Sequence, residues 1–270
     1  MIYYLTQPRY RNALLLVGSF VFYASGRVEH AALLAVCVLV NFWCARRMEK
    51  QEKGRKLWLW AALTYDFSVL IFFKYTGLAG ALPLGISFYT FQITGYMIDV
   101  YRKKFPAEQS LLKLGTYLTM FSQLASGPIV NYGEVREALG KRELSAEGLE
   151  EGLRMLILGL GAKVLVADRI GLLWNDIQTI GFASISTPLA WMGAFGYSLE
   201  LYFDFAGYSM MAIGIGKMLG FAIPENFHFP YMSKSVTEFW RRWHITLGRW
   251  FREYVYIPLG GNRKGKARTF

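Results

Sequence analysis

Long apolar runs are the feature that most constrains how this chain can fold. Crossing a bilayer takes roughly 20 apolar residues, and bilayer hydrocarbon offers the backbone no hydrogen-bond partners, so each crossing should be helical. We therefore expect an all-α, polytopic transmembrane protein with about six to eight membrane-embedded helices. The alternative is a large soluble helical protein with buried helices. The apolar blocks run over residues 12–45, 57–73, 82–100, 111–130, 153–174 and 189–223.

Composition supports the membrane interpretation. Hydrophobic residues make up 54% of the chain and charged residues 18%, against about 45–50% and about 25% in soluble domains. This apolar content excludes intrinsic disorder. With 2 cysteines in 270 residues, a disulfide scaffold is also excluded. Cys37 and Cys44 lie in one apolar block, too far apart along a helix to bridge, and are expected to act as small hydrophobic residues.

Basic residues gather between the apolar blocks and give a formal net charge of +11. Because basic loops stay cytoplasmic, we expect Arg9 and the segments 46–56 and 102–104 inside, and the segments 26–30 and 76–81 outside. Anionic lipid head groups explain this surplus better than nucleic acid does, since no basic stripe lies on a soluble domain. The sequence shows no zinc-ligand spacing and no phosphate-binding loop, so no metal site is expected.

We expect one membrane domain over 1–270, interrupted by its most polar stretch at 131–151. That stretch should form a surface loop with a short interfacial helix, and Ser145 followed by glutamates suggests a helix start. A solvated connector without chemistry is the alternative.

The segment 235–259 reads SVTEFWRRWHITLGRWFREYVYIPL and is expected to form one amphipathic, interfacial helix. Ser235 and Glu238 have capping-box spacing, and Pro258 with Gly260 should end the helix. One apolar and aromatic face recurs at spacings of three and four. It contains Trp240, Trp243, His244, Leu247, Phe251 and Tyr254.

His244 lies within this apolar stripe and allows two interpretations. A histidine in such a place is commonly a hydrogen-bonded core residue. Alternatively, it lines a reaction chamber, where an imidazole can accept a proton near neutral pH. His30 and His228 lie in expected loops and are assigned structural or surface roles.

Charged residues inside apolar blocks are costly and usually face a cavity or a partner. Glu200 and Asp204 would share a helix face, so Asp204 either orients groups in a chamber or forms an ion pair. Five other charged residues lie near block ends or loops, where snorkelling or solvation explains them. They are Asp66, Lys74, Asp99, Lys163 and Asp168.

The run FWRRWHITLGRWFREYVYIPLGGNRKGK resembles the signature of the membrane-bound O-acyltransferase (MBOAT) family, and most closely its alginate O-acetyltransferase branch. Upstream stretches agree and follow in the family's order over nearly the whole chain. They are PLGISFYTFQITGYMIDVYR, SGPIVNY, LGAKVLVAD, LYFDFAGYSMMAIGIGKMLGF and PENFHFPY.

This resemblance implies a multi-pass acyltransferase of the bacterial inner membrane. It would move an acyl group from acetyl-CoA or another thioester to a hydroxyl of an extracellular or cell-wall polysaccharide, without a tightly bound cofactor. It implies an extracytoplasmic, esterase-like acetyltransferase partner. His244 would be catalytic, and five residues would line the chamber or the substrate. They are Trp240, Arg241, Trp243, Asp204 and Asn262.

The resemblance also implies that the chain is a piece of a longer enzyme. Family members carry a further, essential histidine beyond the Gly-Gly-Asn stretch and one more apolar helix ahead of Arg11. A catalytically incomplete fragment, or a subunit that needs a second chain, is therefore an alternative hypothesis. Two further alternative hypotheses are an enzyme that transfers D-alanine to teichoic acid and a transporter.

Overall fold

The computed structural model describes residues 2–77 and 80–261, which form helices and connections with no strand among them. The fold class is therefore all-α. We expected a single domain, but the contacts group the chain into two compact units, each described here by itself. Unit 1 contains Met1–Ala125, Ile129–Glu143 and His244–Phe270, and unit 2 contains Ser126–Pro128 and Leu144–Trp243.

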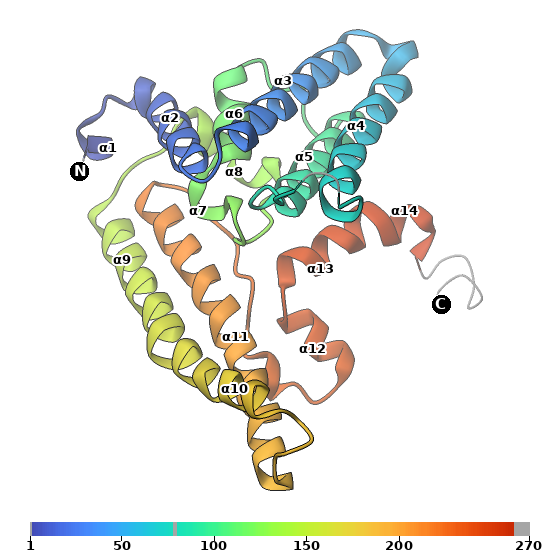
Figure 1. Ribbon diagram of the computed structural model, residues 1–270. Coiled ribbons are helices and arrows are strands. Elements are labelled where there is room, and N and C mark those ends of the chain that lie inside the picture. The colour runs from blue at the N-terminus through green and yellow to red at the C-terminus, as the bar shows by residue number, and fades with distance from the viewer. Residues whose placement is uncertain (1, 78–79, 262–270) are drawn as a thin grey trace. The chain divides into compact units, whose positions relative to one another are not determined.

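Unit 1 contains two long apolar helices, which follow one another in the chain (Figure 1). Val28–Lys50 and Glu52–Tyr75 are long and apolar enough to cross a membrane, and these are the two candidate spans in the described part of the chain. The N-terminal part of unit 1 contains α1 (Ile2–Leu5), η1 (Pro8–Tyr10), α2 (Arg11–Ala24), α3 (Val28–Lys50), η2 (Glu52–Gly54), α4 (Arg55–Tyr75) and α5 (Ile86–Tyr101).

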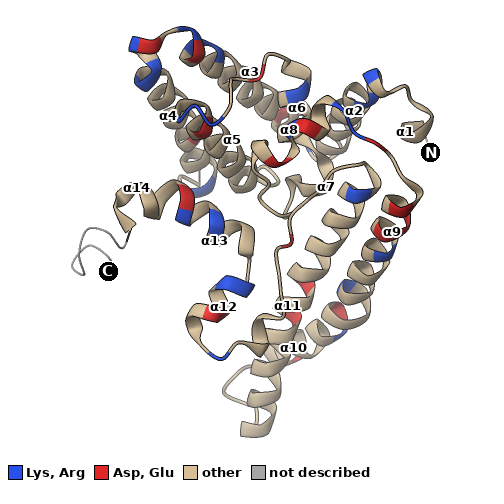
Figure 2. Cartoon of the chain, turned by 180° about the vertical axis from the view of Figure 1, so that it is seen from behind, with Lys and Arg blue, Asp and Glu red and all other residues tan. Residues whose placement is uncertain are grey.

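The loops expected on each side of the membrane meet at the same ends of unit 1. Arg55 donates hydrogen bonds to the carbonyls of Val100 and Tyr101 at 2.8 and 2.9 Å, which joins the two basic segments. Lysines and arginines are concentrated where α3 turns into α4 (Figure 2). The segments Ser25–Arg27 and Ala81–Leu82 line one cavity of about 320 Å³.

The block 111–130 does not form one long helix. It contains α6 (Leu111–Thr119) and α7 (Phe121–Leu124), separated at Met120. At this break, the Phe121 N–H donates a hydrogen bond to Ser19 Oγ at 3.2 Å. Helix α8 (Tyr132–Gly140) follows in the polar stretch and begins with a capping box between Asn131 and Glu134.

Unit 2 consists mainly of α9 and α11, which run side by side (Figure 1). Ser145 caps α9 as expected, because its hydroxyl accepts from the Gly148 N–H at 2.9 Å. The elements of unit 2 are α9 (Ala146–Gly161), the π-helical turn η3 (Ala162–Ala167), α10 (Asp168–Ile180), α11 (Thr187–Met218), η4 (Pro230–Met232) and α12 (Val236–Arg242).

Helices α9 and α11 touch backbone to backbone at two pairs of glycines. A Cβ atom on Gly159 would lie 2.5 Å from the carbonyl oxygen of Gly207, and one on Gly152 would lie 2.6 Å from that of Gly214. In each helix the two glycines are seven residues apart, which places them on one face. Small residues at such crossings let the backbones of membrane helices approach closely. The apolar pattern of the two helices does not by itself predict this contact.

The C-terminal segment differs from the single amphipathic helix expected over 235–259. Helix α12 ends at Arg242, and α13 (Ile245–Phe251) starts after a break at Trp243 and His244, followed by the π-helical turn η5 (Arg252–Tyr256) and α14 (Ile257–Leu259). Ser235 caps α12 and Gly260 follows the last turn, as predicted. The break falls at the boundary between the two units, so each half of the stripe packs within a different unit.

Asp66 also departs from expectation, because it lies in the interior of unit 1 rather than near solvent. It is 2% exposed, and its Oδ1 accepts a hydrogen bond from Nδ2 of Asn41 at 2.8 Å. The Cys37 thiol contacts the same oxygen at 3.6 Å. Cys37 and Cys44 are both buried and free, as predicted. The buried carboxyl group is thus a polar link between α3 and α4, and snorkelling does not explain it.

Candidate functional site

His244 occupies the N-cap position of α13 in a left-handed conformation, with φ +44° and ψ +53°. Few non-glycine residues adopt this conformation, and such strain is typical of functional positions. The side chain is half-buried. Its ring stacks on Phe88 of α5, with ring centroids 6.4 Å apart and an interplanar angle of 26°. The break therefore places the imidazole against the Phe88 ring rather than on the side of a continuous helix.

Three polar contacts attach α13 to its surroundings in unit 1. The Thr246 hydroxyl accepts from the Ile129 N–H at 3.0 Å, and the Trp250 indole donates to the Phe91 carbonyl at 2.8 Å. Arg249 forms an ion pair with Glu134 at 2.6 Å. These contacts fix the start of α13, and with it the backbone that carries His244.

The turn η5, which follows α13, is held by the buried carboxylate of Asp99. The Tyr254 hydroxyl donates to Asp99 Oδ2 at 2.8 Å, and Lys104 Nζ lies 2.9 Å from Asp99 Oδ1. Lys104 also pairs with Glu253. Asp99 is 4% exposed, so it joins α5 to η5 instead of facing solvent as the sequence analysis expected.

The environment of His244 favours a neutral imidazole. Burial lowers the pKa of His244 from its ordinary value to about 4, because the charged form loses solvation there. At neutral pH the ring therefore has a nitrogen lone pair that can accept a proton. A base in this state does not have to lose a proton before it acts.

Four other residues expected to line the chamber, Trp240, Arg241, Trp243 and Asp204, belong to unit 2. Trp243 packs among aromatic rings, stacked on Phe239 at 5.6 Å and edge-on to Phe227 at 5.1 Å. Trp240 is 61% exposed, and Arg241 is exposed as well. Trp250, which was not assigned to the expected apolar stripe, is buried.

Asp204 forms an ion pair, which was one of its two interpretations. Lys163 Nζ lies 2.8 Å from Asp204 Oδ1 and 2.5 Å from Asp168 Oδ1. The three charges join α11 to η3 and the start of α10. Asn262 lies outside the described residues.

The remaining histidines lie apart from these contacts. His30 packs its ring edge-on against Phe73, and the His228 side chain is exposed beside Glu225. Within residues 2–77 and 80–261, no group of three or more His, Cys, Asp or Glu side chains could hold a metal ion.

Residues 103–270 match the membrane-bound O-acyltransferase family, and the chain belongs to that family, as the resemblance predicted. It is 40% identical to a probable alginate O-acetylase AlgI of Pseudomonas fluorescens, over all of this chain and 56% of that protein. It is 33% identical to a peptidoglycan O-acetyltransferase of Helicobacter pylori, over 96% of this chain and 58% of that protein.

A more distant branch is also similar. A teichoic acid D-alanyltransferase of Bacillus subtilis is 33% identical over 64% of this chain and 45% of its own length. The chain spans little more than half the length of the curated relatives that it matches along its whole length.

Proposed function

We propose that this chain is part of an O-acetyltransferase that moves an acetyl group from a thioester donor, such as acetyl-CoA, to a hydroxyl of an extracytoplasmic polysaccharide. The observation that carries the proposal is the half-buried imidazole of His244, held in a left-handed conformation at the start of α13. The names of the relatives support an acetyl group and a polysaccharide acceptor. Alginate and peptidoglycan are both candidates.

In the proposed reaction, His244 accepts the proton of the acceptor hydroxyl as its oxygen attacks the thioester carbonyl. The new carbon–oxygen bond replaces the carbon–sulfur bond, and the proton passes from the imidazole to the leaving thiolate. A dry site limits competing hydrolysis. The chain itself provides the base, and the donor is a substrate, so no tightly bound cofactor is required.

We further propose a multi-pass protein of the bacterial inner membrane, with the basic segments 46–56 and 102–104 in the cytoplasm. The two candidate spans, α3 and α4, support this topology. The donor would enter from the cytoplasmic side. An extracytoplasmic, esterase-like partner would complete the transfer to the polymer.

Donor selection by the complete protein tests this function. Membrane vesicles containing the complete protein, its extracytoplasmic partner and a polysaccharide acceptor would be supplied with radiolabelled acetyl-CoA or with a D-alanyl thioester. We expect acetyl esters on the polymer and no D-alanyl esters. Vesicles without the protein are the control. Transfer of D-alanine instead, or of neither group, would contradict the proposal.

A further inference from the structure

Gln92 of α5 is a buried polar residue whose side chain is left without a hydrogen bond in the described part of the chain. It is 2% exposed, and neither its Nε2 nor its Oε1 atom has a partner. A carboxamide can donate two hydrogen bonds and accept two, and leaving them unmade in the interior is energetically costly. A ligand that paired with Gln92 would remove this cost.

Gln92 lies on the face of α5 that packs against α13. It comes four residues after Phe88, whose ring stacks on that of His244, and three residues before Gly95. A Cβ atom on Gly95 would lie 3.4 Å from Trp250 Nε1. Residues three and four apart share a helix face, so Gln92 is placed between the contact with His244 and the contact with Trp250.

The backbone at Gln92 is held in place by two neighbouring side chains. The Tyr117 hydroxyl donates to the Gln92 carbonyl at 3.3 Å and to the Val130 carbonyl at 2.8 Å. The Trp250 indole donates to the preceding carbonyl, that of Phe91, at 2.8 Å. Both donors are used by backbone carbonyls, so the Gln92 side chain is positioned by its surroundings without being paired by them.

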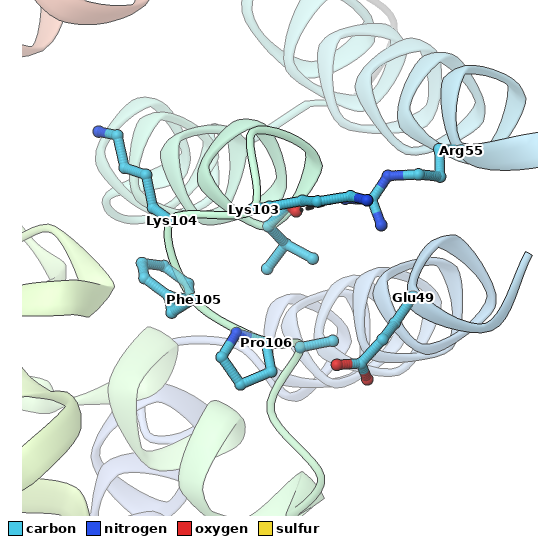
Figure 3. A pocket seen from close by; sticks show the side chains of 8 residues that line it. Glu49, Arg55, Lys103, Lys104, Phe105 and Pro106 are labelled. Atoms are coloured by element: carbon cyan, nitrogen blue, oxygen red, sulfur yellow. Dashed lines mark hydrogen bonds between the residues drawn. The ribbon is translucent and has the colours of Figure 1, made fainter. Parts of the chain in front are cut away.

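The charged groups at the end of α5 differ from Gln92 because they have partners within the fold. Lys103 pairs with Glu52 at 2.5 Å, and Lys104 Nζ lies 2.9 Å from Asp99 Oδ1. The two lysines point to different sides of the turn that follows α5 (Figure 3). Their charges are thus used in holding the structure together.

Two other residues of α5, Tyr89 and Thr94, also have a buried hydroxyl without a partner. Neither is three or four residues from Phe88 or from Gly95, so neither shares the face that packs against α13. On that face, the uncommitted polar side chain is that of Gln92.

Acyl transfer needs a hydrogen-bond donor as well as a base. While the base takes the proton of the attacking hydroxyl, negative charge develops on the carbonyl oxygen of the thioester, and a preorganised N–H donor in a dry site stabilises that charge. The Nε2 group of Gln92 is an uncharged, buried donor one helical turn from the ring that stacks on His244. Its Oε1 atom remains to accept from a second N–H or O–H group of a substrate.

We propose that Gln92 is a catalytic residue, which donates a hydrogen bond from Nε2 to the carbonyl oxygen of the acyl thioester. The inference rests on the proposed function and deepens it, because it assigns the group that binds the acyl carbonyl. A glutamine that held only a structural water would instead contribute to stability, and this difference can be measured.

The test compares activity and stability in Gln92→Met, which preserves the length of the side chain and removes the donor. The complete protein would be assayed in membrane vesicles with its extracytoplasmic partner, acetyl-CoA and a polysaccharide acceptor. We expect kcat to fall about 100-fold, as for the loss of one oxyanion donor. The KM for acetyl-CoA should stay unchanged, because the lost hydrogen bond acts in the transition state. The midpoint of thermal unfolding should not fall, because methionine replaces an amide that had no partner.

Gln123→Met is the matched control. Gln123 is also a buried glutamine of unit 1, but its Nε2 donates to the Tyr117 carbonyl at 3.3 Å. This variant should lower the unfolding midpoint and leave kcat per folded molecule unchanged. Wild-type kcat in Gln92→Met, or a fall in its unfolding midpoint like that of Gln123→Met, would overturn the role of Gln92 alone. Absence of acetyl transfer by the wild type in the same vesicles would overturn the proposed function, and this inference with it.

Discussion

Replacement of His244 by alanine in the complete protein is expected to reduce polysaccharide acetylation at least about 100-fold, because a positioned base contributes about 10²–10⁴ to such a reaction. The imidazole is half-buried and stacked on Phe88, and its lowered pKa keeps it in the unprotonated form that a base requires. Acetyl release from the polymer after mild alkali measures the effect.

Two further variants make this test specific. His228→Ala, which changes an exposed histidine of unit 2, should acetylate normally. His244→Gln keeps a polar side chain at the break but removes the base, and should be as inactive as the alanine variant. Membrane levels of all three proteins should match the wild type. Normal acetylation by the His244→Ala variant would show that His244 takes no part in the reaction.

Substitution of Gly159 by alanine should separate α9 from α11 and destabilise unit 2 by about 1–3 kcal/mol. The new Cβ atom would lie 2.5 Å from a backbone carbonyl oxygen, which cannot rotate away as a side chain can. The expected fall in the midpoint of thermal unfolding in detergent is about 3–10 °C.

Gly161 provides the matched control, because it is two residues further along the chain and a Cβ atom there meets nothing within 4 Å. Gly161→Ala should be neutral or should stabilise the protein by up to about 1 kcal/mol through its higher helix propensity. Equal midpoints for Gly159→Ala and Gly161→Ala would show that the close backbone contact does not hold the helix pair together.

Local signals in the sequence predicted local structure correctly. Ser145 and Ser235 cap the helices that they were expected to begin, because capping depends on residues three positions away. The family was predicted mainly from the sequence motif around His244.

Non-local features were not predictable in the same way. Periodicity over 235–259 is the same for one helix and for two, so the break at His244 could not be seen. It depends on contacts such as that of Trp250 with the Phe91 carbonyl, 159 residues away in sequence. The partners of Asp66 and Asp99 likewise lie on other helices. A single charged residue in an apolar block does not indicate which residue it contacts.

The most direct test of the account is a measurement of the pKa of His244 itself. The chain has 3 histidines, so a chain with His30→Gln and His228→Gln gives one histidine signal by NMR after ¹³C labelling. A lowered pKa means that the ring stays neutral as the pH falls through 6.5 and becomes protonated only near 4. We predict a titration midpoint near pH 4. A midpoint at or above about 6.5, the ordinary value for histidine, would contradict the burial of the His244 ring beside Phe88 on which the account of the site depends.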